Sequence, residues 1–185
     1  MLFRSYTKVS EAEAAEFLRA YDLGALEELQ GIKSGVSNTN YRLRTSRGAY
    51  ILTLYEGETA AEDIDYFLAL TEHLAARGVP CPVPVRGRDG AVRYRLAGRP
   101  AAVVSFLEGA SVSRVTPGEC RELGRAMAAM HKAGMDFPRR RANALALEGA
   151  GKLFAAVAAR ADEVQPGLAN AVRARSEEHT SELQS

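Results

Sequence analysis

The sequence predicts an α+β fold in which a mostly antiparallel sheet with one long helix comes first and helices alone follow. Two observations support this prediction. Short stretches with the alternation and turn residues of strands dominate residues 26–107. Beyond them, residues 116–164 carry helix caps and apolar residues at helical spacing instead. The segment Gly109–Ser113, rich in small residues, is typical of a linker between the two parts.

Composition and charge narrow the class of protein. The chain has 185 residues, 46% hydrophobic and 25% charged, which suits one globular domain or one lobe with part of another. No apolar run reaches the ~18 residues of a membrane span, and the start lacks the apolar core of a signal peptide. A formal net charge of +1 gives no electrostatic case for nucleic acid or an anionic membrane. Cys81 and Cys120 lack metal or disulfide spacing, so we expect a soluble protein of the reducing cytoplasm.

The first elements each have a local signal. A helix begins at Ser10, which can form a capping box with Glu13, and Gly24 stops it. Alternating apolar and polar residues, with turn residues between them, then predict three strands at 26–33, 39–45 and 49–55.

A second helix and a proline-rich segment follow. Thr59 and Glu62 have the spacing of another capping box, and Gly78 closes the helix that they begin. Three alternating prolines keep residues 79–85 extended. Arg88–Gly90 predicts a hairpin turn between short strands, and a last strand is expected at 99–107.

Two more helices are expected after the linker. Thr116 supplies an N-cap with Glu119 as its partner, and Gly134 ends that helix; another is predicted at 152–164. Buried positions are expected to include Met127, Met130, Cys81 and Cys120.

The end of the sequence differs in character from the rest. Residues 175–185 are identical to one reading frame of a common short-read sequencing adapter, and we interpret them as non-native. The alternative is the polar end of a C-terminal helix. We expect the native protein to continue beyond Ala174.

One segment carries candidate chemistry. Gly31–Tyr41 lies between the first two predicted strands and is made of small and polar residues. Backbone N–H groups in such a loop can approach a phosphate, and the side chains of Ser37, Asn38 and Thr39 add hydrogen-bond donors. A polar hairpin with a glycine bulge would have the same composition and is the alternative.

Several separated stretches resemble bacterial homoserine kinases of the aminoglycoside-phosphotransferase-like superfamily, over Thr7 to about Val172. The stretches are 35–41, 51–56, 78–82, 98–109, 130–131 and 141–143. The resemblance implies a protein-kinase-like small lobe joined to the start of a helical lobe. It implies a nucleotide-binding lobe with its leading helix at 1–107 and a hinge and truncated helical lobe at 108–174, followed by the segment 175–185 already interpreted as non-native.

The same resemblance implies ATP-dependent phosphorylation of the L-homoserine side-chain hydroxyl, in threonine biosynthesis. It places Thr53 where other members of the superfamily hold a lysine or arginine, and Glu62 at the ion-pair position of the helix. The phosphate-covering residues would be Ser34, Gly35, Val36, Ser37, Asn38, Thr39 and Asn40. The adenine would lie along Ser105, Phe106 and Leu107.

The machinery of phosphoryl transfer is not found in the sequence. Neither His73 nor His131 begins an H-x-D-x-x-x-x-N motif, and Asp136 is followed by Phe-Pro, not by the Phe-Gly of a metal-binding triplet. We therefore assign no catalytic and no metal-binding residue, expect the Mg²⁺ ligands further along the native protein, and expect this fragment to be inactive alone. The Arg139–Arg141 run predicts a solvated loop, with substrate-anion binding as the alternative.

Two other functions stay open. One is a related small-molecule kinase acting on choline, methylthioribose or an aminoglycoside. The other is a non-catalytic nucleotide-binding module, which would need the exposed apolar residues of the last helices to be tolerated in solution.

Overall fold

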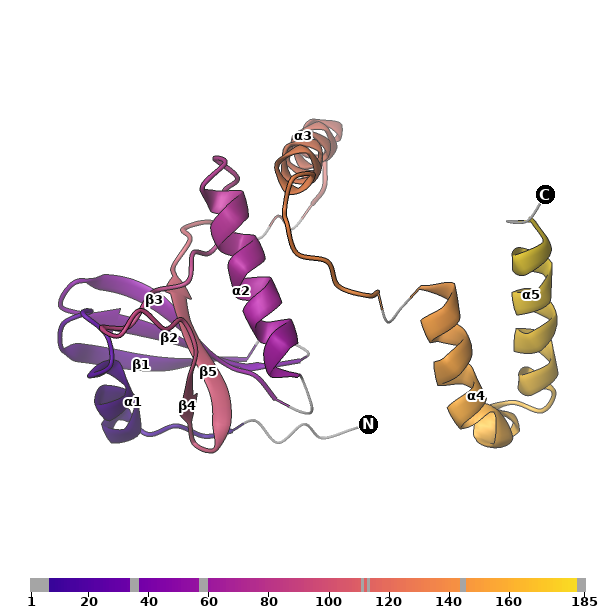
Figure 1. Cartoon of the computed structure of the whole chain (residues 1–185), viewed down its shortest axis with the longest axis horizontal. Helices are drawn as coiled ribbons and strands as arrows, with labels where there is room; N and C mark the ends of the chain where they lie inside the picture. Colours follow the sequence, from indigo (N-terminus) through magenta and orange to yellow (C-terminus); the bar gives the residue numbers. More distant parts are fainter. Residues whose placement is uncertain are drawn as a thin grey trace. The chain divides into compact units, whose positions relative to one another are not determined.

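The chain forms two compact units, residues 1–140 and 141–185 (Figure 1). The computed structural model describes residues 7–33, 37–56, 60–110, 112, 114–143 and 146–182. The first unit contains a five-stranded antiparallel sheet with the order β1-β2-β3-β5-β4. Its strands are β1 (Leu26–Ile32), β2 (Thr39–Thr45), β3 (Gly48–Leu54), β4 (Tyr94–Leu96) and β5 (Arg99–Ser105). The α+β fold is confirmed, as are the positions of the strands predicted at 26–33, 39–45 and 49–55.

The larger hydrophobic core lies between one face of the sheet and α1 (Glu11–Leu18). Ser10 caps this helix in the predicted capping box with Glu13. Gly24, with a φ of 78°, turns the chain before β1. Alternate residues of the central strands close the core against the helix: Leu43, Leu52, Leu54, Ala101 and Val103, all fully buried.

The other face of the sheet carries α2 (Ala61–Ala75) over a smaller core. Ile64 and Leu68 of the helix pack on Ala102 of β5, with Tyr55 and Val92 at the edges. The expected capping box of Thr59 and Glu62 is wrong, because the helix begins one residue later and its N-cap is Ala60, which has no side-chain acceptor. Thr59 itself lies outside the described residues.

The proline-rich segment runs extended beside β5, as predicted. Val85 N donates to Val103 O at 2.8 Å and Ser105 N donates to Val83 O at 2.8 Å. The turn at Arg88–Gly90 forms, but no named strand flanks it. The hairpin is made further along, between β4 and β5, where Gly98 has a φ of 76°. Local turn residues could not distinguish these two places.

The helix α3 (Pro117–Gly134) begins at Thr116 in the predicted capping box with Glu119. Its C-terminal end meets α2, where His73 Nε2 lies 3.0 Å from Ala133 O and Asp136 pairs with Arg77. The burial predicted for some residues of α3 is wrong: Met127, Met130 and Cys120 are exposed. Within the described part of the first unit, nothing packs on that side of the helix.

The second unit is a pair of helices, α4 (Leu147–Val164) and α5 (Leu168–Glu182), that pack on each other (Figure 1). The helix predicted at 152–164 starts five residues earlier, at Leu147. Pro166 and Gly167 separate the two helices, and Gly167 has a φ of 81°. Residues 168–182, which include part of the segment that we interpret as non-native, form a helix not predicted from the sequence. Across the described residues, no helix has the length and apolar character to cross a membrane.

The α1-facing core should dominate the stability of the first unit. Leu52 is fully buried in it, so Leu52→Ala is expected to lower the free energy of unfolding by about 2–5 kcal/mol through lost burial and a residual cavity. Val115, which is 68% exposed, is the control, and Val115→Ala should change it by less than about 0.5 kcal/mol. Urea denaturation followed by circular dichroism measures both; equal effects would contradict this assignment of the core.

Candidate functional site

The α2-facing side of the sheet presents two rows of side chains that cross three strands. Antiparallel register places Asn40 beside Thr53 and Thr53 beside Ala102. The next row on this face contains Arg42, Ile51 and Val104. Because α2 covers Ala102 with Ile64 and Leu68, the polar residues of β2 and β3 form the remaining part of the face. This part adjoins the loop that the sequence predicts for phosphate binding.

Thr53 and Asn40, both predicted site residues, are brought together by the fold. Thr53 Oγ1 donates a hydrogen bond to Asn40 Oδ1 at 2.8 Å. Because the amide oxygen is occupied, the two N–H groups of the Asn40 side chain are oriented away from Thr53 and can donate elsewhere. Ser37 is exposed and Asn38 is half-buried just before β2. The predicted residues Ser34, Gly35 and Val36 lie outside the described residues.

Thr39 occupies the opposite face from Asn40. Its side chain is buried, and Oγ1 donates to Glu56 Oε1 at 2.7 Å. The backbone N–H of Thr7 donates to the same carboxylate oxygen at 3.1 Å. Thr39 thus anchors the start of β2, and its hydroxyl does not join the row formed by Asn40 and Thr53.

Glu56 is the centre of this anchor and was not predicted from the sequence. Its side chain is only 16% exposed and lies 3.2 Å from the guanidinium of Arg99. Burial acts to raise the pKa of Glu56, but hydrogen bonds from Thr7 and Thr39 and the charge of Arg99 lower it below its ordinary value. The carboxylate therefore stays ionised and connects the chain after β3 to the strand that follows the predicted phosphate loop.

The end of β5 supplies the other part of the site. Ser105 Oγ accepts a hydrogen bond from Val83 N at 2.9 Å, so its hydroxyl is used to hold the proline-rich segment. Backbone pairing between β3 and β5 ends at Ser105, and Phe106 and Leu107 lie beyond it. Their backbone N–H and C=O groups therefore lie outside the hydrogen-bond pairing of β3 and β5, where the edge of a ligand ring can bond to them. Leu107 is 47% exposed.

Arg42 is a residue of this site that sequence reasoning missed. Its guanidinium lies over the ring of Phe106, 4.9 Å from the centroid, in a cation–π contact. The signal was present, because the alternation of β2 puts Arg42 on the same face as Asn40. Only the fold shows that Phe106, far along the chain, lies beside it.

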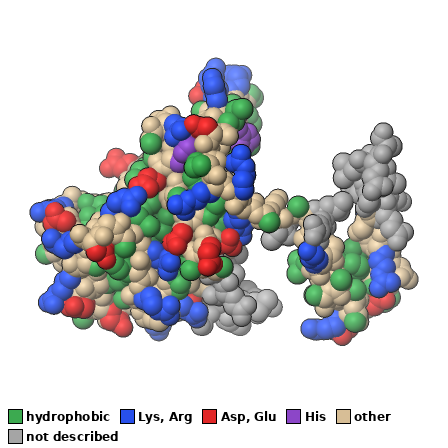
Figure 2. Space-filling view, in the orientation of Figure 1, with side chains coloured by type: hydrophobic (Ala, Val, Ile, Leu, Met, Phe, Trp, Pro, Cys, Tyr) green, Lys and Arg blue, Asp and Glu red, His purple; other side chains and the backbone are tan. Residues whose placement is uncertain are grey.

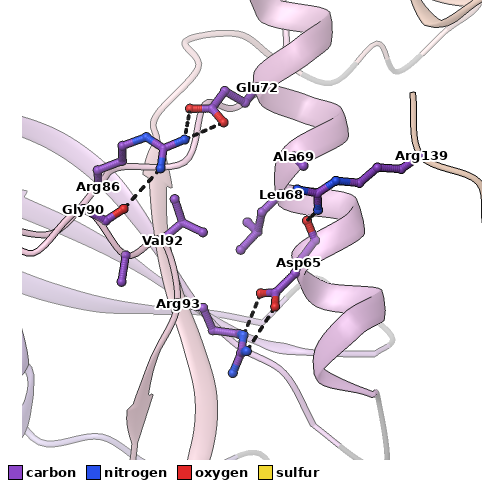
Figure 3. Close-up of a pocket in the computed structure, with 10 residues that line it drawn as sticks. Asp65, Leu68, Ala69, Glu72, Arg86, Gly90, Val92, Arg93 and Arg139 are labelled. Atoms are coloured by element: carbon purple, nitrogen blue, oxygen red, sulfur yellow. Dashed lines mark hydrogen bonds and ion pairs between the residues drawn. The ribbon is translucent and has the colours of Figure 1, made fainter. Parts of the chain in front are cut away.

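The helix α2 borders the site with a line of charged residues. Glu62 is exposed in its first turn, and among the described residues no ion pair involves it. One turn further on, Asp65 accepts two hydrogen bonds from Arg93, at 2.8 and 3.2 Å. A cavity of about 410 Å³ adjoins this pair (Figure 3). Its lining comprises Asp65, Leu68, Ala69, Glu72, Arg86, Gly90, Ala91, Val92, Arg93 and Arg139.

Basic and acidic side chains are interspersed on the face of the molecule shown in Figure 2. Among the described residues, no group of three or more His, Cys, Asp or Glu side chains could hold a metal ion. Asp136 is bonded to His73 and paired with Arg77, so it serves the contact between α2 and α3. The described residues thus offer hydrogen-bond donors of the kind that bind phosphate and unpaired backbone groups beyond Ser105. They do not include a cluster of Mg²⁺ ligands.

Comparison with known proteins gives consistent matches. The sequence profile described as "Phosphotransferase enzyme family" matches residues 28–184. Homoserine kinase from Xanthobacter autotrophicus is 52% identical over 91% of this chain and 53% of its own length. Homoserine kinase from Methylobacterium nodulans is 53% identical over 91% of this chain and 53% of its own length. Homoserine kinase from Rhodopseudomonas palustris is 51% identical over 91% of this chain and 52% of its own length.

The fold is also similar to that of a solved structure. Spectinomycin phosphotransferase, in complex with ADP and spectinomycin, matches with a TM-score of 0.54 and 13% identity, over 85% of this chain and 56% of that one. This likeness confirms the kinase-like fold predicted from the sequence. The chain spans about half the length of the curated relatives that it matches.

Removing the charge of Glu56 tests whether its ionised carboxylate holds the start of β2. Glu56→Gln should lower the free energy of unfolding at pH ~7 by about 1–3 kcal/mol, because charge-assisted hydrogen bonds are lost. Since the folded pKa is depressed, the contribution of Glu56 is fully present above the unfolded pKa of about 4.3 and is lost as pH falls through the folded value. Urea denaturation at several pH values should show the two proteins converging in acid.

The control for this measurement is Glu28→Gln. Glu28 pairs with Arg44 through a side chain that is 53% exposed, and its loss should change stability by less than about 0.5 kcal/mol. A difference between Glu56→Gln and the unchanged chain that persists at pH ~2–3 would contradict an ionised Glu56 as the anchor.

Proposed function

Because the chain belongs to the phosphotransferase enzyme family, we propose that it forms the nucleotide-binding part of an ATP-dependent kinase for the side-chain hydroxyl of L-homoserine. The observation that carries this proposal is the identity of 51–53% to curated homoserine kinases over 91% of the chain. An identity of that extent includes most of the sheet that builds the site. The reaction belongs to threonine biosynthesis, and we expect it in the cytoplasm.

The described residues fit a nucleotide on the α2-facing side of the sheet. Asn40, oriented by Thr53, would donate to a phosphate oxygen. The backbone beyond Ser105 would bind the adenine edge, with Phe106 near the ring. When bound, ATP supplies the phosphoryl group. The ADP named in the spectinomycin phosphotransferase complex supports a nucleotide in this fold.

Phosphoryl transfer also requires a group that positions the acceptor hydroxyl and ligands for Mg²⁺. We propose that these come from the part of the relatives' length that this chain does not match, and that the chain alone does not phosphorylate homoserine. The exposed apolar residues Leu123, Met127 and Met130 of α3 support this division. An apolar helix face of this kind normally packs against further structure.

The substrate is tested with the protein extended to the length of its relatives. Steady-state assays with L-homoserine, choline, methylthioribose and spectinomycin should give a kcat/KM for homoserine at least about a hundredfold above the others, because a site built to bond one polar substrate rejects analogues strongly. The 185-residue chain should give no product with any of them.

Three results would contradict this proposal. Preference of the extended protein for another acceptor would favour a different small-molecule kinase of the family. Phosphorylation of homoserine by the 185-residue chain would show that the catalytic groups lie within it. Nucleotide binding without turnover by the extended protein would favour a non-catalytic module.

The role of Thr53 has a matched control on the other face of the sheet. In the extended protein, Thr53→Val should raise the KM for ATP about fivefold, because a hydrogen bond of about 1 kcal/mol no longer orients Asn40. Thr45→Val removes a comparable hydroxyl, which donates to Gly48 O at 3.2 Å on the α1-facing side. That variant should leave the KM for ATP unchanged. Equal changes in the two variants would argue against a nucleotide-facing Thr53.

A further inference from the structure

The helix α2 rests on the sheet through a small apolar contact. Only Ile64, Leu68 and Ala102 are fully enclosed there, whereas the α1-facing core has four times as many buried members. A contact of three residues restrains the helix weakly against sliding or rotation. The strand beneath, β5, has one basic residue, Arg99, and that residue pairs with Glu56. Other groups must therefore set the position of the helix.

Two arginines of the segment before β4 connect α2 to the rest of the first unit. Arg93 donates to both carboxylate oxygens of Asp65, at 2.8 and 3.2 Å. Arg86 donates to both oxygens of Glu72, at 2.6 and 2.7 Å. Asp65 and Glu72 are two turns apart and share one face of the helix. Figure 3 shows both guanidinium groups reaching α2 from the same side.

The Arg93–Asp65 and Arg86–Glu72 pairs differ in their exposure to solvent. Arg93 is 28% exposed, whereas Arg86 is 55% exposed. Hydrogen bonds from Arg93 lower the pKa of Asp65, and the charges of Arg93 and Arg139 add to this effect. Arg139 also donates to the backbone oxygen of Asp65 at 3.3 Å. The Asp65 carboxylate is therefore ionised and bonded by Arg93, while Arg139 bonds the backbone of the same residue.

Asp65 also lies near Tyr55, which follows β3 and, with Glu56, leads to the candidate site. Asp65 follows Ile64, a member of the apolar cluster against which Tyr55 packs. Burial raises the pKa of Tyr55, and the charge of Asp65 raises it further. Tyr55 packs against the core under α2 and its N–H donates to Pro100 O at 2.9 Å. The next residue is Glu56, which anchors Thr39 at the start of β2. A shift of the N-terminal half of α2 would thus reach Glu56 and, through Thr39, the position of Asn40.

We propose that Arg93 is a positioning residue of the nucleotide site, which fixes the N-terminal half of α2 through Asp65 and thereby holds Glu56 and the start of β2 in place. The proposal rests on the proposed kinase function. Arg93 touches no reacting atom; its role is geometric. Partly exposed ion pairs contribute little to stability, but a bidentate arginine–carboxylate pair fixes direction as well as distance. The expected consequence is a loss of function larger than the loss of stability.

The test compares Arg93→Ala with Arg86→Ala in the protein extended to the length of its relatives. Both changes remove an arginine that contacts both carboxylate oxygens of an acidic residue on the same face of α2. Only Arg93 bonds through two nitrogens, and only its partner Asp65 follows Ile64, in the cluster against which Tyr55 packs. Arg93→Ala should lower kcat/KM for ATP about tenfold or more, because small displacements of binding groups are costly. The KM for L-homoserine and the thermal midpoint should stay nearly unchanged. Arg86→Ala should alter kcat/KM for ATP by less than about twofold.

Rescue variants distinguish positioning from general damage. Arg93→Lys keeps the charge but cannot form the bidentate pair, so it should recover only part of the activity. The exchange Asp65→Arg with Arg93→Asp should recover more than either single change. Equal losses in Arg93→Ala and Arg86→Ala, or a loss in Arg93→Ala that follows its thermal midpoint, would overturn the proposal.

A separate measurement keeps the proposed function apart from this inference. If the extended protein phosphorylates no homoserine, the proposed substrate is wrong, and titration with ADP decides the role of Arg93 alone. Weaker ADP binding in Arg93→Ala than in Arg86→Ala would support positioning. Identical ADP affinities in the two variants would overturn it.

Discussion

The alternation of side chains along β2 and β3 separates an apolar face of the sheet from a polar one, and the rest of the first unit depends on this separation. Leu43, Leu52 and Leu54 close the core against α1, and their sequence neighbours necessarily point the other way. Antiparallel register then places Asn40 against Thr53, with a 2.8 Å hydrogen bond between them. A one-residue slip would move both polar side chains into the core, so the apolar face also determines the geometry of the candidate site.

Glu56 fixes the start of β2, from which residues of both faces follow. Its half-buried carboxylate accepts hydrogen bonds from Thr39 and from the backbone of Thr7 and pairs with Arg99, all on the apolar side. It thereby fixes the point where the chain enters β2. The candidate site lies one residue away, at Asn40, on the other face. Side chains that stabilise the sheet and side chains of the candidate site thus alternate along the same few residues, which explains why Thr39 serves the first role although its neighbours suit the second.

The helix α2 connects the sheet to the first helix of the following part. Its contacts with the sheet are partly ionic, through Asp65 and Glu72, and its C-terminal end joins α3 through His73, Arg77 and Asp136. Membership of the phosphotransferase enzyme family gives this arrangement a functional context, since the chain matches half the length of homoserine kinases. This helix contacts both the sheet face that holds the candidate site and the first helix of the helical part.

The sequence by itself determined the α+β class, four of the five strands of the sheet and two of the three expected capping boxes, because alternation, turn residues and helix caps act within a few residues. It also indicated the polar loop before β2, and its resemblance to homoserine kinases identified Thr53. Only the tertiary structure decided which residues meet. Arg93 reaches Asp65 across 28 residues, Arg42 lies over Phe106, and Glu56 meets Arg99. Such contacts depend on strand order and on the side of the sheet that each helix covers, and no local pattern records either.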